Sequence, residues 1–84
     1  PRPAVDPGRK EITMKIEHVN AKTVPARTYH FNARWRDFGF VRRAVGMSNA
    51  QWASEIVRAA RECADDNGLN YDEIQILRAG EPCY

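Results

Sequence analysis

The stretch from Met47 to Gly68 constrains the fold most, because it carries the signals of one amphipathic helix at both of its ends. Ser48 is a suitable N-cap, and Gln51 three residues later completes a capping box, which satisfies backbone N–H groups left free by the first helical turn. Gly68 can adopt the left-handed conformation that closes a helix, with Leu69 folding back onto it. The sequence therefore predicts a helix between Met47 and Gly68.

This predicted helix has one apolar face. The apolar residues that recur at helical spacing are Trp52, Ile56, Ala59, Ala60 and Cys63. The opposite surface carries Glu55, Arg58, Arg61, Glu62 and Asp65. A helix with a single apolar stripe is stable when that stripe is covered by another element, so a second layer is required.

Two stretches before the helix alternate in polarity with a period of two, which is the pattern of a half-buried strand. The first covers residues 11–19 and places Ile12, Met14, Ile16 and His18 on one face. The second covers residues 28–36 and places Tyr29, Phe31, Ala33 and Trp35 on one face. Three of these four side chains are aromatic and can bury a large area, so we expect this face to meet the helix.

A third strand is predicted from Phe40 to Val45, joined to the second by a turn over residues 37–39. We expect Val41 and Val45 to point inward, with Phe40 and Arg42 on the open face and Arg43 near the core. An alternative makes residues 38–47 a helix, which would form a helix-turn-helix with the helix that follows.

A fourth strand is predicted over residues 73–79, at an edge of the sheet. The predicted order is β-β-β-α-β, an α+β fold in which one amphipathic helix packs on one face of a small antiparallel sheet. The chain has 84 residues, which allows one small domain, and we assign it to residues 11–80. Residues 1–10, with three prolines, are expected to form an extended or mobile arm, and residues 81–84 a C-terminal tail.

The sequence carries no constellation typical of catalysis or of metal binding. His18 and His30 are not spaced with Cys63 or Cys83 as in a zinc site, and there is no glycine-rich phosphate loop or nucleophile elbow. We therefore predict a protein that is not an enzyme and has no catalytic residue, metal or cofactor.

The lengths of the apolar runs and the number of cysteines indicate in which cell compartment the protein is expected. The uncharged apolar runs are too short to span a membrane, so we expect no membrane contact. The first ten residues lack the apolar block of a secretory signal, and two cysteines are too few for a disulfide framework. These features predict a cytoplasmic protein.

Charge divides the chain into a basic and an acidic part. Residues 1–47 hold ten lysines and arginines against four acids, whereas residues 48–84 hold three against seven. The formal net charge of +2 conceals this division. A positive field over the predicted sheet would attract phosphate or an acidic partner.

The polar face of the second strand is the predicted binding surface. If the aromatic side of residues 28–36 is buried, the pleat sends the intervening polar side chains to the open side. With neighbours from the first and third strands, the predicted nucleic-acid-binding residues are Lys15, His30, Asn32, Arg34, Arg36, Phe40 and Arg42. Arginine and asparagine are residues that contact phosphates and base edges, so the predicted partner is DNA or RNA.

The alternative is a protein-interaction or regulatory module, acting as a homodimer or an accessory subunit. Such a module would dock an acidic protein on the same arginines or pair with another chain at the sheet edge.

Overall fold

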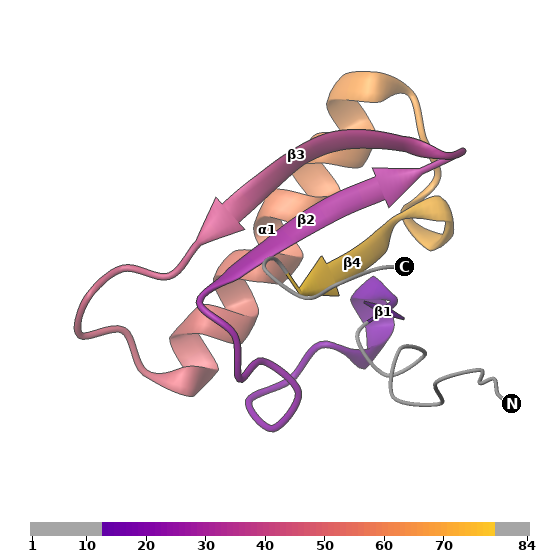
Figure 1. The fold of residues 1–84 in the computed structure, drawn as a ribbon. Helices are drawn as coiled ribbons and strands as arrows, with labels where there is room; N and C mark the ends of the chain where they lie inside the picture. Colours follow the sequence, from indigo (N-terminus) through magenta and orange to yellow (C-terminus); the bar gives the residue numbers. More distant parts are fainter. Residues whose placement is uncertain (1–12, 79–84) are drawn as a thin grey trace, which may run out of the picture.

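The computed structural model describes residues 13–78, in which one helix lies across one face of a four-stranded antiparallel sheet (Figure 1). The strands are β1 (Thr13–Met14), β2 (Thr28–Ala33), β3 (Arg36–Arg42) and β4 (Gln75–Arg78), and the helix is α1 (Asn49–Asn67). Two short 3₁₀ helices, η2 (Ile16–His18) and η3 (Tyr71–Glu73), precede β2 and β4 respectively. The predicted α+β class and the β-β-β-α-β order are confirmed.

The predicted ends of α1 are confirmed. The backbone N–H of Gln51 donates to Ser48 Oγ at 3.1 Å, and the backbone N–H of Ser48 donates to Gln51 Oε1 at 2.9 Å. At the other end Gly68 has a φ of 68°, and the N–H of Leu69 donates to the carbonyl of Ala64 at 2.9 Å. Both ends are therefore fixed by local hydrogen bonds that their sequences specify.

Replacing Ser48 with alanine is expected to lower the free energy of unfolding by about 1 kcal/mol, since the N–H of Gln51 loses its acceptor. Urea denaturation followed by circular dichroism measures this loss. Ser48→Asp supplies another acceptor and should keep most of the stability. Equal losses in both variants would contradict the capping role.

The core lies between α1 and the sheet. From α1 it contains Trp52, Ile56, Ala60 and Ala64, all fully buried, and from the sheet Tyr29, Phe31, Ala33 and Ile76. The indole N–H of Trp52 donates to the carbonyl of Ala26 at 2.9 Å, so its polar atom is satisfied inside the core. The predicted apolar stripe of the helix is thus confirmed, and so is the predicted dry side of residues 28–36 as far as Ala33.

The first predicted strand is much shorter than its alternation indicates. Among the described residues of this segment, Thr13–Met14 form the strand that pairs with β4, and η2 follows after Lys15. The chain then turns at Asn20, whose side chain accepts the N–H of Lys22 at 2.8 Å and whose own N–H donates to Thr23 Oγ1 at 2.9 Å. Such local side-chain bonds compete with strand pairing. Residues 11 and 12 lie outside the described residues.

The turn between β2 and β3 lies three residues earlier than predicted. Arg34 and Trp35 form it, with positive φ values of 52° and 68°, and β3 begins at Arg36. Trp35 is consequently fully exposed, so its predicted place in the core is wrong. Residues 37–39, predicted as the turn, are part of β3.

The end of β3 also differs from the prediction. The strand stops at Arg42, and Val45, predicted to point inward, is 98% exposed in a turn. Arg43 lies close to the core as expected, and its guanidinium donates to the carbonyl of Met47 at 2.6 Å. Because Arg36–Arg42 is a strand, the helical alternative for residues 38–47 is wrong.

The last strand is inside the sheet. The order is β1-β4-β2-β3, so β4 pairs on both sides and the predicted edge position is wrong. The long edge strand is β3, which pairs only with β2. Glu73, predicted as the first residue of the last strand, belongs to η3.

The predicted arm (residues 1–10) and tail (residues 81–84) lie outside the described residues. No helix within residues 13–78 has the length and apolar character that crossing a membrane requires.

Candidate nucleic-acid interface

The sheet face turned away from α1 is open. Residues directly opposite one another on neighbouring strands point to the same side of a sheet. His30 faces Phe40 on β3 and Leu77 on β4, and it lies between the buried side chains of Tyr29 and Phe31. By this register the open face carries Thr28, His30, Asn32, Asp37, Phe40, Arg42, Gln75 and Leu77.

Two rings form the centre of this open face. The ring centroids of His30 and Phe40 are 5.7 Å apart, and the planes are inclined by 40°. Phe40 is 60% exposed, so much of its ring faces solvent. Asp37 lies beside the pair, with its carboxylate 3.3 Å from His30 Nδ1, and it also accepts the N–H of Gly39 at 3.0 Å. The open face therefore presents an accessible aromatic ring, Phe40, on the paired strands β2 and β3.

Four of the seven predicted site residues meet on this face. They are His30, Asn32, Phe40 and Arg42. The side chain of Arg42 is exposed, and it lies two residues from Phe40 on the same side of β3. Asn32 faces Gln75 on β4, which places two amide side chains next to the ring pair.

Arg34 is held away from the open face by an ion pair. Its Nε lies 2.6 Å from Glu73 Oε1, and its Nη2 lies 3.1 Å from Glu73 Oε2, which is a two-pronged contact. This contact raises the pKa of Arg34. The Arg34 guanidinium and then the N–H of Asn70 lower the pKa of Glu73. The side chain of Arg34 therefore links the β2–β3 hairpin to η3 through this ion pair.

Arg36 and Lys15 also lie elsewhere. The guanidinium carbon of Arg36 is 5.2 Å from the ring centroid of Phe38, which packs against the core, so Arg36 lies on the α1 side. Lys15 Nζ donates to the carbonyl of Asp72 in η3 at 3.0 Å. The open face is consequently less basic than predicted, and Arg42 is the predicted arginine that it retains.

The charge division of the sequence is preserved in space. Residues 27–43, which contain the β2–β3 hairpin, hold five arginines and one acid, Asp37. Helix α1 holds four acids against Arg58 and Arg61, and it lies behind the sheet (Figure 1). Arg58 is already paired with Glu55 and Glu62. The positive layer is thus the hairpin, and the negative layer is the helix.

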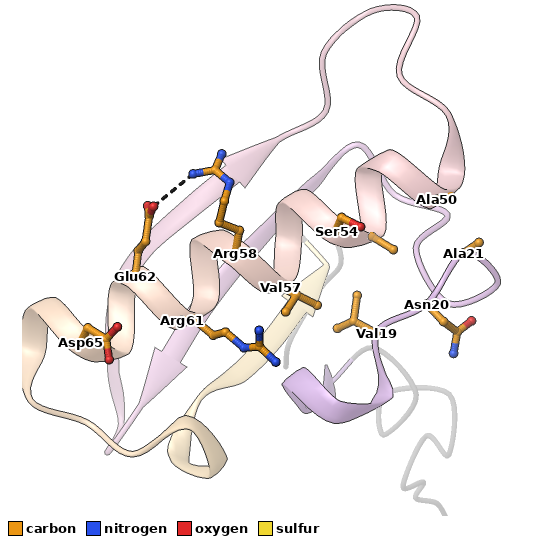
Figure 2. Close-up of a pocket in the computed structure, with 11 residues that line it drawn as sticks. Val19, Asn20, Ala21, Ala50, Ser54, Val57, Arg58, Arg61, Glu62 and Asp65 are labelled. Carbon is orange, nitrogen blue, oxygen red and sulfur yellow. Dashed lines mark hydrogen bonds and ion pairs between the residues drawn. The ribbon is translucent and has the colours of Figure 1, made fainter.

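A groove lies between α1 and the loop before β2 (Figure 2). Small apolar side chains, including Ala50 and Val57, line it together with Val19 from the loop before β2. Its rim carries both signs of charge, and Arg61 lies over the ring of Tyr71 at 5.8 Å. Since no set of polar groups of one kind converges there, the groove favours no class of ligand.

Residues 13–78 contain no cluster of three or more histidine, cysteine or acidic side chains placed to hold a metal ion. Burial, followed by the charge of Asp66, raises the pKa of the Cys63 thiol, which is the opposite of nucleophile activation. No known protein family, curated protein or solved structure matches this chain.

Trp35, like Val45, is exposed although the sequence predicts that it points inward. Trp35 continues the alternation of Tyr29, Phe31 and Ala33, so the pattern alone assigns it to the buried face. Two-residue hairpin turns of the kind that needs positive φ at both positions favour Asn-Gly, and Arg34-Trp35 lacks that signal. The pattern therefore gave no indication that the strand ends at Ala33.

Proposed function

We propose that the protein binds single-stranded nucleic acid on the open face of its sheet. The observation that carries this proposal is the exposed ring of Phe40, in contact with His30 and followed on the same side by Arg42. Single-strand-binding proteins combine aromatic rings, on which bases stack, with cationic side chains that follow the phosphates. The open face offers both kinds of group on one pair of strands.

Each group on the face has a role in this proposal. Phe40 stacks on an unpaired base, and His30 supports the ring from the neighbouring strand. Arg42 binds a phosphate, and the amides of Asn32 and Gln75 donate to base edges or to the sugar–phosphate backbone. The excess of arginine on the hairpin provides a positive field around the strand.

A single strand fits this surface better than a duplex. Duplex binding without base readout depends on many phosphate contacts, and the open face holds one arginine and one carboxylate, Asp37. A stacking ring needs a base that is not already stacked on both sides, and an unpaired strand supplies it.

The test measures the fluorescence anisotropy of a labelled random-sequence 12-nucleotide strand, as DNA and as RNA, at low salt. Phe40→Ala is expected to weaken binding about fivefold, since one base stack contributes about 1 kcal/mol or more. Arg42→Gln is expected to weaken binding and to reduce the salt slope by about one.

Arg61→Gln is the matched control, because it removes the same charge from α1, behind the sheet. It should leave the affinity close to that of the parent chain. Absence of binding to both polymers at low salt, or equal losses in the two arginine variants, would contradict the proposal.

The position of β3 favours a second candidate function. This seven-residue strand pairs with β2 on one side, and no described strand lies on its other side. Such an edge can pair with a strand from another chain, which would make the protein a homodimer or an accessory subunit. Light scattering after gel filtration tests the dimer, and a monomeric mass at micromolar concentration would contradict it.

A further inference from the structure

The tip of the β2–β3 hairpin presents an aromatic residue that packs on nothing in the described part of the chain. Trp35 is 102% exposed, more than any other large apolar side chain there. It occupies the second position of a two-residue turn, after Arg34, and both residues have positive φ. Figure 1 shows this turn at the end of the hairpin, where β2 passes into β3.

The backbone at the tip indicates that Trp35 has a role outside the fold. A positive φ is unfavourable for a bulky residue, and this type of turn favours asparagine and glycine. Strain of this kind is usually offset by packing, yet the indole of Trp35 buries nothing. Strained residues of this kind cluster at ligand-binding and active sites.

Hydrogen bonds join the tip of the hairpin to η3. Arg34 holds Glu73 through two contacts, and Glu73 also accepts the N–H of Asn70 at 2.9 Å. These bonds tie the turn to η3, which is distant in sequence. The indole therefore projects from a turn whose backbone is anchored to η3.

Both neighbours of Trp35 in the chain are arginines, and the carboxylate of Glu73 neutralises one of them, Arg34. Arg34 and Arg36 flank Trp35 in the chain, and Arg36 lies over the ring of Phe38. The acid nearest in sequence, Asp37, is turned toward His30 on the open face. An exposed indole next in the chain to the Arg36 guanidinium suits a ligand that combines a flat ring with a negative charge, which is the chemistry of a nucleotide.

We propose that Trp35 is a second base-stacking residue for the strand bound at Phe40. The inference rests on the proposed function. The turn begins at Arg34, four positions after His30, which is about 13 Å at the usual rise of a strand. A bound strand would run along the hairpin from the His30–Phe40 ring pair to the tip, with one base on each ring.

The two tryptophans of the chain make this proposal directly measurable. Trp52 is fully buried, whereas Trp35 is fully exposed, so quenching of tryptophan fluorescence by an added strand reports Trp35. Titration of the unlabelled random 12-nucleotide strand is expected to quench the parent chain with the midpoint seen by anisotropy. Trp35→Phe, which leaves Trp52 alone, is expected to lose the quenching and to keep most of the affinity.

Trp35→Ala is expected to weaken strand binding by about fivefold or more, as for the loss of one base stack. Trp35→Gly removes the ring and relieves the backbone, so it should weaken binding while melting no lower than the parent chain. This variant separates a loss of stacking from a loss of fold.

The outcomes distinguish the two proposals. If the parent chain binds no strand, the proposed function fails and the inference fails with it. If the strand binds and Phe40→Ala weakens it, but Trp35 is not quenched and Trp35→Ala binds as the parent does, only the inference is overturned. Equal quenching by a 12-base-pair duplex would also overturn base stacking at Trp35.

Discussion

Trp52→Ala is expected to lower the free energy of unfolding by about 3–5 kcal/mol. Trp52 is completely buried, its ring lies 6.0 Å from that of Tyr29, and its N–H donates to the carbonyl of Ala26. Alanine would leave a cavity between α1 and the sheet and deprive that carbonyl of its donor. If the parent chain lies at the low end of the usual range, about 5 kcal/mol, this loss leaves about 0–2 kcal/mol, and a measurable fraction is then unfolded at 25 °C.

Urea denaturation followed by far-ultraviolet circular dichroism measures this effect. Trp52→Phe keeps most of the apolar volume and loses the hydrogen bond, so it should fall between the parent chain and the alanine variant. Trp35→Ala is the matched control, because it removes the same side chain from a fully exposed position. Parent-like stability of Trp52→Ala would contradict the packing of α1 on the sheet.

The helix could be predicted closely because its signals are local. The Ser48–Gln51 capping box and the left-handed Gly68 act within one turn of the residues they stabilise. The apolar stripe repeats through Trp52, Ile56 and Ala60, so its buried face follows from spacing alone. No distant contact was needed to place either end.

The sheet was predicted less well than the helix. The alternation of apolar and polar residues shows which side chains share a face of a strand, but it does not show where the strand ends. This pattern correctly placed Tyr29 and Phe31 in the core. It also extended the predicted strand through Trp35, which lies in the turn after the strand has ended. Gly39 suggested a turn, although it lies inside β3. The place of β4 between β1 and β2 depends on pairing between distant segments, which local patterns do not encode.

Fewer of the predicted site residues share one face than the sequence indicated, because that prediction depended on the same strand ends. His30, Asn32, Phe40 and Arg42 share a face because they lie within the true strands β2 and β3. Arg34 does not lie on the open face, because the turn after β2 begins at Arg34. Its side chain pairs with Glu73, thirty-nine residues further along the chain. Such a pair is visible only in the folded chain, where it holds the Arg34 guanidinium on Glu73 and away from the open face.

Gly39→Val is expected to lower the free energy of unfolding by about 1–3 kcal/mol, although valine is favoured in strands. Gly39 has a φ of 148°, which L side chains rarely adopt, and the register shifts here because Phe31 faces Gly39 while Asn32 faces Asp37. Phe38 is therefore the extra residue of a bulge. A β-carbon at Gly39 would meet nothing within 4 Å, so the cost arises in the backbone.

The same substitution is expected to weaken binding of the single strand, because the bulge sets which side of β3 Phe40 occupies. Urea denaturation measures the loss of stability, and amide hydrogen exchange along β2 and β3 locates it. Arg42→Val is the control for valine in this strand, since Arg42 is exposed and its stability change should stay within about 0.5 kcal/mol. If Gly39→Val were as stable as the parent, with its hairpin amides equally protected, β3 could not contain this bulge, and the register that brings Phe40 opposite His30 would be wrong.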